Sequence, residues 1–245
     1  FPHGPVTRLQ LGRSVLGRPI RTADAYLVDD LLIDSGPPAT AAELVRWCRD
    51  REIRRVILTH HHEDHAGGSA GLQEAVGLEI STSAKALSIV GDFPRLELYR
   101  RAVWGQPRSL EASPLGSVVH TRRHRLDVIS TPGHCDDHVC FFEPKERWLF
   151  SGDLFIHERA RYLNADEDVY QILRSLRRVL ALRPRMLFCG HGGVVADASS
   201  AIERKIRYWE GLRERVEALG ERGLSAEQIR DRLLGREGMA TRLSG

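Results

Sequence analysis

The order of apolar and polar positions along the chain predicts a series of short β-strands. The run at 6–11 is one of them, and the run at 25–34 is divided by Asp29 and Asp30 into the two halves of a hairpin. Later apolar runs bounded by turn residues predict six further strands, at 55–59, 79–83, 126–131, 139–142, 147–151 and 185–189. All of these have lengths that are usual for strands of globular proteins.

Other segments repeat their apolar residues at the spacing of an α-helix. In 166–182, Val169, Ile172, Leu176 and Val179 recur on one face. Further helices are predicted at 40–51, 71–76, 84–104, 200–219 and 225–234. Capping-box pairs precede three of them, namely Thr40 with Glu43, Ser200 with Glu203, and Ser225 with Gln228. The succession of strand, helix and strand predicts an α/β fold.

Ligand-type side chains follow directly after four of the predicted strands. After the strand at 55–59, positions 60–65 read His-His-His-Glu-Asp-His. His134, Asp153 and His191 each stand beside a glycine at the end of a later strand. Imidazole and carboxylate are the usual ligands of zinc and similar ions, and an apolar core gains nothing from four imidazoles together. The pattern therefore favours a metal site over a solvated polar turn.

Composition indicates the class of protein and leaves its partner open. The chain has 245 residues, of which 42% are hydrophobic and 28% charged, as is ordinary for a soluble domain. Its net charge of +3 and pI of about 8.8 are too mild to argue for nucleic acid. We see no apolar run of membrane-spanning length and no secretory leader pattern, so we expect a cytoplasmic protein. The first residue is Phe1 rather than Met, which leaves open a start further upstream and a continuation beyond residue 245.

The four cysteines form no C-x-x-C pair and are too few for a disulfide scaffold in a chain of this length. We interpret them as reduced thiols. Cys135 and Cys189 lie beside the candidate ligands His134 and His191, but the set of imidazoles and carboxylates is complete without a thiolate.

The positions of these groups resemble the metallo-β-lactamase-fold hydrolase superfamily. The matching motifs occur in the family's order: Asp34, His60-x-His62-x-Asp64-His65, Thr131-Pro132-Gly133-His134, Ser151-Gly152-Asp153 and Gly190-His191-Gly192. The resemblance implies a four-layer αββα sandwich of the α/β (α+β) class, in which two mixed sheets lie between layers of helices and the site lies at one edge. We place the catalytic domain at 1–220 and a short helical C-terminal extension at 221–245.

The same resemblance implies a role for each candidate ligand. One metal would be held by His60, His62 and His134, the second by Asp64, His65 and His191, and Asp153 would bridge both. Asp34 would orient the ligand loop from outside the metal shell. His61 and Glu63 fall at variable positions of the family, and His138 would have a structural role. The implied cofactors are two Zn²⁺ ions, with Mn²⁺ or Fe as alternatives.

Hydrolysis of an ester-type bond is the reaction that such a site implies. Two cations about 3.5–4 Å apart can share a water molecule and lower its pKa enough to supply hydroxide at neutral pH. Asp64 is a candidate acceptor for the proton of the nucleophile, although its role as a ligand limits its freedom. The histidine at 65 and the aspartate, rather than cysteine, at 153 argue against a true β-lactamase.

Two interpretations of the substrate remain. The motifs at 131–138 and 150–153 and the helix at 200–219 resemble the β-lactamase-like 2 group, which includes single-strand-specific endoribonucleases with a winged-helix-like extension that 221–245 would begin. This resemblance favours a phosphodiester, as in RNA, or a small-molecule ester. A thioesterase or lactonase of the glyoxalase II type is the alternative, although the Gly-Cys-Gly-Arg pattern of that group is missing at 154–159. A mononuclear iron enzyme like persulfide dioxygenase and a non-catalytic binding module are less favoured, because the ligand set is complete.

The remaining candidates for substrate contact have simpler alternatives. Arg159, Arg161 and Tyr162 either contact substrate or form a surface loop. The basic run at 120–125 is typical of a solvated turn, with phosphate binding as the alternative. The aromatic residues in 84–104 favour core packing over a pocket wall. We expect a small-molecule ester or thioester, or a single-stranded nucleic acid, as the partner, and the sequence leaves open a homodimer.

Overall fold

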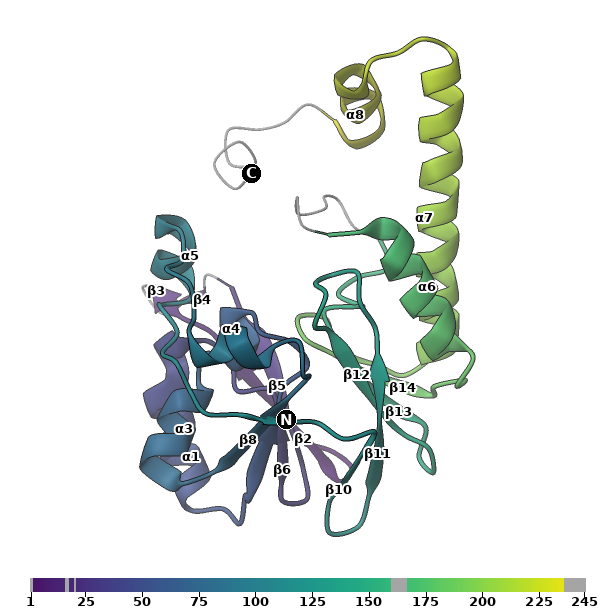
Figure 1. Ribbon diagram of the computed structural model, residues 1–245. Coiled ribbons are helices and arrows are strands. Elements are labelled where there is room, and N and C mark those ends of the chain that lie inside the picture. Colours follow the sequence, from purple (N-terminus) through teal and green to yellow (C-terminus); the bar gives the residue numbers. More distant parts are fainter. Residues whose placement is uncertain (1, 16–17, 20, 160–166, 236–245) are drawn as a thin grey trace.

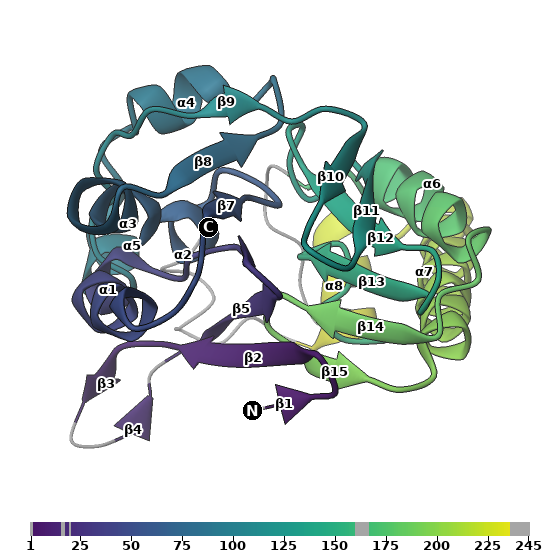
Figure 2. The same ribbon diagram turned by 90° about the horizontal axis from the view of Figure 1, so that it is seen from below.

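The computed structural model describes residues 2–15, 18–19, 21–159 and 167–235 and consists of two β-sheets packed face to face with helices outside them (Figure 1). Figure 2 shows the layers edge-on, with α1 (Ala41–Arg49) and α3 (Ser69–Val76) against the first sheet and α6 (Val169–Leu180) and α7 (Ala198–Glu221) against the second. This arrangement confirms the predicted αββα sandwich. Within the described part of the chain, no helix combines the length and the apolar character needed to cross a membrane.

The first sheet contains seven strands in the order β1-β2-β5-β6-β7-β8-β9. Their bounds are β1 Pro2–His3, β2 Val6–Leu11, β5 Ala23–Val28, β6 Leu31–Ile33, β7 Arg55–Ile57, β8 Glu79–Thr82 and β9 Ser113–Pro114. The strands from β6 to β9 pair in parallel because helical connections return the chain to the same end of the sheet, whereas β1, β2, β5 and β6 form antiparallel pairs. The connections contain η1 Pro38–Thr40, α2 Glu63–Ala66, α4 Leu87–Gly91 and α5 Leu98–Val103, and the small pair β3 Ser14–Val15 and β4 Arg18–Pro19 is separate.

The second sheet contains six strands in the order β10-β11-β12-β13-β14-β15. Their bounds are β10 Val118–His120, β11 Arg125–Ser130, β12 Val139–Glu143, β13 Trp148–Gly152, β14 Met186–Cys189 and β15 Gly193–Val195. All residues of β12 and β13 are buried, because the first sheet covers one face and α6 with α7 covers the other. The last described helix, α8 (Ala226–Leu234), contacts α7.

Aromatic side chains connect the two sheets in the middle of the sandwich. The ring centroid of Tyr26, on β5, lies 5.7 Å from that of Phe150 and 5.3 Å from that of Phe188, both in the second sheet. The Tyr26 hydroxyl donates to the carbonyl oxygens of Cys189 at 2.7 Å and Gly193 at 3.2 Å. These contacts determine how the first sheet sits on the second.

Most predicted elements agree with the structure, and the exceptions have local causes. The single helix predicted at 84–104 is wrong: α4 and α5 are separate helices, with Pro94 in the segment between them. The Thr40 capping box is absent, because the Thr40 hydroxyl donates to Pro37 O instead. The box at Ser200 is also wrong, since α7 already begins at Ala198. The capping box at Ser225 is confirmed. The predicted division between 1–220 and 221–245 stays a prediction.

Removing the Tyr26 hydroxyl tests the connection between the sheets. We expect Tyr26→Phe to lower the free energy of unfolding by about 1–3 kcal/mol, because two buried carbonyl oxygens lose their donor while the ring is kept. Urea unfolding followed by circular dichroism measures this change. Tyr170→Phe, at a ring that is exposed on α6, is the matched control. Equal midpoints for the two variants would show that the hydroxyl does not hold the sheets together.

Candidate metal centre

Four strand ends meet at one edge of the sandwich. Within the second sheet, β11, β13 and β14 run in the same direction, since β11 and β13 are both antiparallel to β12 and β14 is parallel to β13. Their C-terminal ends therefore bring His134, Asp153 and His191 to the same edge. The loop after β7 of the first sheet supplies 60–65, and the ring centroid of His60 lies 5.0 Å from that of His134. The structure thus brings together all seven ligand candidates.

Two glycines permit the close approach of these loops. Gly152 has a φ angle of +46°, and a Cβ at this position would lie 2.7 Å from His138 Nε2. A Cβ on Gly190 would lie 2.4 Å from Asp153 Oδ1. A side chain at either position would therefore displace a residue of the site.

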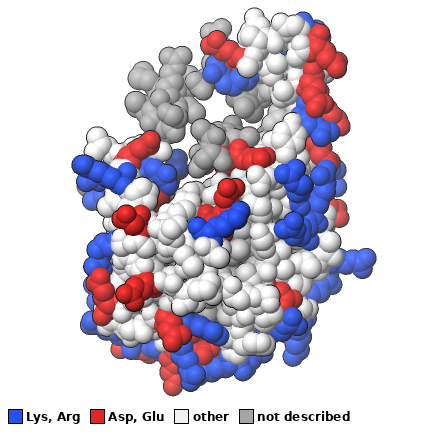
Figure 3. All heavy atoms as spheres, in the orientation of Figure 1, with Lys and Arg blue, Asp and Glu red and all other residues white. Residues whose placement is uncertain are grey.

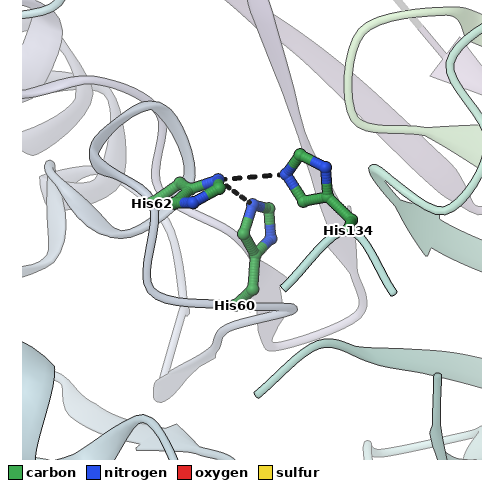
Figure 4. A group of neighbouring side chains, drawn as sticks. All are labelled: His60, His62 and His134. Carbon is green, nitrogen blue, oxygen red and sulfur yellow. Dashed lines mark hydrogen bonds between the residues drawn. The ribbon is translucent and has the colours of Figure 1, made fainter. Parts of the chain in front are cut away.

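The first group of converging atoms consists of three imidazole nitrogens (Figure 4). His62 Nδ1 lies 3.1 Å from His60 Nε2 and 3.0 Å from His134 Nε2. An imidazole nitrogen carries either one proton or one lone pair, so His62 Nδ1 can form a good hydrogen bond with only one of these two nitrogens. Three nitrogens that bind one tetrahedral ion at about 2.0–2.1 Å would lie about 3.3 Å apart, so the observed spacing fits a shared cation.

The second group lies beside the first and contains Asp64, His65 and His191. Asp64 Oδ2 lies 3.0 Å from His191 Nε2, and His65 Nε2 lies 3.4 Å from the same nitrogen. Asp64 and His65 are consecutive residues of α2, whose four residues are all buried. The arrangement offers one carboxylate and two imidazoles to a second cation.

Asp153 lies between the two groups. Its Oδ1 is 3.2 Å from His65 Nε2, and its Oδ2 is 3.4 Å from His191 Nε2 and 3.6 Å from His134 Nε2. Oδ1 is fully buried, yet it makes no hydrogen bond of normal geometry among the described residues. A buried carboxylate oxygen without a donor is costly unless a cation compensates it. The Asp153 carboxylate is therefore in the position of a bridging ligand.

Burial and charge set the protonation of these groups. Burial, reinforced by the neighbouring rings, lowers the pKa of His60 and His62 well below the usual value, so both rings are neutral. Burial alone would lower the pKa of His65 and His191 too, but the surrounding carboxylates, led by Asp153, raise it well above the usual value. Burial alone would also raise the pKa of Asp153, which these two imidazoles hold well below its usual range. Metal ligands must be deprotonated, so a bound cation would take the place of the protons on His65 and His191.

Asp34 connects the two groups from outside them. Its carboxylate accepts from His65 Nδ1 at 2.9 Å and from the Thr59 backbone N–H at 2.8 Å. The Thr59 hydroxyl also donates to Asp34, at 2.8 Å, and lies 3.0 Å from His60 Nδ1. One carboxylate thus contacts a ring of each group, directly for His65 and through Thr59 for His60, and the orienting role that the resemblance implies for Asp34 stays a prediction.

Two contacts with the outer nitrogens were not predicted. Glu167 Oε1 lies 2.7 Å from His134 Nδ1, and the Thr22 carbonyl oxygen accepts from His191 Nδ1 at 2.7 Å. The hydrogen bond to Glu167 raises the pKa of His134 despite its burial. Glu167 precedes Asp168, which caps α6, so in sequence it looks like an ordinary acidic residue at a helix start. No local signal relates it to His134.

The remaining polar residues of the ligand loops have other partners. His138 Nε2 accepts from the Asp153 backbone N–H at 3.1 Å, and burial lowers the pKa of His138 to about 3. His61 Nδ1 donates to Asp137 at 2.7 Å. Glu63 forms a bidentate ion pair with Arg100 of α5, at 2.8 and 2.6 Å. Each of these residues supports the loops and stays outside the two groups described above.

The cysteines lie outside the two groups of histidine and aspartate ligands described above. The sulfur of Cys135 lies near ring nitrogens of His61 and His62, within 4.8 Å. Burial, reinforced by Asp137, raises the pKa of the Cys135 thiol, and burial raises that of Cys189 to about 12. Cys189 belongs to none of the groups of converging ligand atoms among the described residues.

Comparison with known proteins relates this site to named enzymes. The chain is 28% identical over 195 residues to the thioesterase pkgB of Emericella nidulans, which covers 76% of this chain and 51% of the relative. It is 29% identical over 185 residues to a beta-lactamase-like protein 2 homolog of Drosophila melanogaster, and the alignment covers 73% of this chain and 60% of the relative. It is 31% identical over 156 residues to a hydroxyacylglutathione hydrolase of Rhizobium meliloti, and the alignment covers 63% of this chain and 54% of the relative. The chain thus spans between half and two thirds of the length of these relatives.

The fold and the family agree with these relatives. A crystal structure of a metallo-beta-lactamase family protein from Thermus thermophilus superimposes with a TM-score of 0.64 at 24% identity, covering 86% of this chain and 82% of that one. The family model described as the metallo-beta-lactamase superfamily matches residues 19–191. Because this match includes more than half of the chain and all of the converging residues, the chain belongs to the metallo-beta-lactamase superfamily.

Proposed function

We propose that this protein is a metal-dependent hydrolase that cleaves a thioester or a related ester of a small molecule. The observation that carries the proposal is the convergence of seven imidazole and carboxylate side chains, with the buried Asp153 carboxylate between two groups of three. The names of the relatives support the type of bond, since one is a thioesterase and another is a hydroxyacylglutathione hydrolase.

We assign the ligands by the atoms that face one another. His60 Nε2, His62 Nδ1 and His134 Nε2 would hold the first cation, Asp64, His65 and His191 would hold the second, and Asp153 would contribute to both. Two divalent cations at these positions would supply an activated water and would polarise the carbonyl group of the substrate. Imidazole with carboxylate suits Zn²⁺, which we propose, and also accepts Mn²⁺ or Fe.

The protein groups around the centre orient the ligands and handle protons. Asp34 holds the rings of His65 and, through Thr59, of His60 in fixed tautomers. His138 holds the backbone of Asp153. We assign proton acceptance from the nucleophile to Asp64, whose Oδ2 lies at the edge of the second group.

Helix α5 provides an apolar rim beside the centre. Arg100 anchors it to Glu63 of the ligand loop, and the ring centroid of Trp104 lies 6.1 Å from that of His191. Leu98 and Tyr99, six and five residues before Trp104, are exposed at 80% and 44%. Figure 1 shows α5 standing above the sandwich at the edge from which the loops emerge. Exposed apolar side chains at this place suit the acyl part of a substrate.

A phosphodiester substrate, the other interpretation, has less support. The cations of the basic run at 120–125 are engaged, Arg122 with Glu52 at 2.6 Å and Arg123 with Asp29 at 2.5 Å. Basic and acidic side chains are interspersed over the face that Figure 3 shows. Of the loop candidates, Arg161 and Tyr162 lie outside the described residues. RNA cleavage, the mononuclear iron and non-catalytic alternatives, a homodimer and a cytoplasmic location stay predictions.

A substrate panel combined with metal analysis tests the proposed function. We expect about two equivalents of metal per chain and hydrolysis of an acyl thioester that a chelator abolishes. Asp64→Asn should lower kcat/KM by about 100-fold or more, because it removes both a carboxylate ligand of the second group and the assigned proton acceptor. His120→Ala, at an exposed ring away from the ligand loops, is the control. Cleavage of single-stranded RNA but of no thioester or ester, or activity that survives complete metal removal, would contradict the proposal.

The Glu167 contact predicts a change in metal affinity. Glu167→Gln weakens the acceptor for His134 Nδ1, so we expect the first cation to bind about 10–100-fold less tightly. Competition with a chromophoric chelator measures the affinity directly, independently of turnover. Glu214→Gln, at an exposed site on α7, is the control. An affinity equal to that of the control would mean that Glu167 does not position the ring.

A further inference from the structure

A cavity lies outside the ligand cluster, between α7, α8 and the segment that follows Asp153. Its volume is about 560 Å³, which falls within the range of small-molecule sites. Its walls carry four arginines: Arg159 from the segment, and Arg204, Arg207 and Arg215 from α7. The proposed hydrolysis makes no use of these residues.

The cavity has an excess of positive charge. Among the described residues that line it, the acidic one is Glu158, which pairs with Arg204 at 2.6 Å. Arg207 lies 3.7 Å from Glu203, one helical turn earlier, and both side chains are exposed. Guanidinium groups form paired hydrogen bonds with phosphate oxygens, so several of them around one cavity favour a phosphorylated ligand over a neutral one.

The cavity also has an apolar wall. Tyr208 and Leu212 of α7 and Leu233 of α8 line it together with the arginines. A free phosphate ion would use only the charged part. A phosphate attached to an organic group, as in a nucleotide, would use both parts, because an aromatic ring and leucines can pack against its base or its alkyl chain.

The segment 154–159 joins the cavity to the ligand cluster. Its start packs against the His191 loop, since a Cβ on Gly192 would lie 2.3 Å from the Ile156 carbonyl oxygen. Its end is held by α7, where the buried Lys205 donates to the His157 carbonyl oxygen at 3.0 Å. Glu158 is five positions after Asp153 in the chain, so the Cα atoms of the two residues lie no more than about 18 Å apart. A ligand with a long flexible arm can reach from one site to the other.

We propose that this cavity binds the phosphorylated end of a pantetheine thiol carrier, while the thioester at the other end of the pantetheine arm is presented to the ligand cluster. The proposal rests on the proposed thioesterase function and adds the substrate class. The shared chemistry is a phosphate on pantetheine, which occurs both in coenzyme A and in free 4′-phosphopantetheine. The apolar wall predicts that the nucleotide of coenzyme A adds to the affinity.

Three thioesters of the same acyl group test the proposal: acyl-coenzyme A, acyl-4′-phosphopantetheine and acyl-pantetheine. For the metal-loaded wild type we expect KM to rise in that order, by about tenfold or more overall. In the double variant Arg207→Ala/Arg215→Ala, the preference for acyl-coenzyme A over acyl-pantetheine should fall at least tenfold through KM. Arg213→Ala, whose side chain pairs with Glu217 and does not line the cavity, should keep the wild-type preference. A preference that is the same in the double variant and the wild type overturns the proposal.

Direct binding separates this proposal from the proposed function. If the wild type hydrolyses none of the three thioesters, the thioesterase function fails. Calorimetric titration with coenzyme A then tests whether the cavity binds this ligand. Binding at least tenfold tighter in the wild type than in the double variant supports the proposed binding site. Equal binding or no binding overturns it. Binding of single-stranded RNA that the double variant loses, without binding of coenzyme A, also overturns it and indicates a nucleic-acid site.

Discussion

The burial of carboxylates and imidazoles against one another at one edge of the sandwich is the constraint on which the structure depends. Asp153 is 9% exposed and faces three imidazoles, and one of its oxygens has no donor among the described residues. Water would solvate such groups far better than a protein interior does, so their charges must be balanced locally. In our proposal two cations provide that balance, and Asp34 with Thr59 keeps the rings turned toward them.

The two sheets are both needed to satisfy this constraint. The first sheet supplies the ligand loop after β7, and the second supplies the three remaining loops from strands that run in the same direction. A shift of one sheet against the other would separate His60 from His134. Tyr26 opposes such a shift, since its ring packs on Phe150 and Phe188 and its hydroxyl bonds to the backbone that leads into His191. The core and the site are therefore stabilised by the same geometry.

The centre itself supports many hydrolytic reactions, so the selection of substrate must come from its surroundings. Helix α5 is tied to the ligand loop by Glu63 and carries exposed apolar residues, while α7 and α8 enclose arginines around a separate cavity. An apolar rim on one side and a cationic cavity on the other suit a substrate with an acyl end and an anionic end. The anchoring of α5 explains why Glu63, at a variable position of the loop, is buried and paired.

The αββα arrangement and the grouping of His60–His65 with the three later loops were implied by the family resemblance. The sequence by itself determined most of the strand and helix order, the α/β class and the placement of ligand-type residues at four strand ends. It could do so because these signals are local: apolar periodicity, glycine beside a strand end, and ligand spacing within one loop. Contacts between distant segments were decided only by the tertiary structure. Glu167 at His134, the Thr22 carbonyl at His191 and the cavity between α7, α8 and 154–159 leave no pattern within any one segment. The break between α4 and α5 is different, because Pro94 is a local signal that the apolar periodicity by itself does not record.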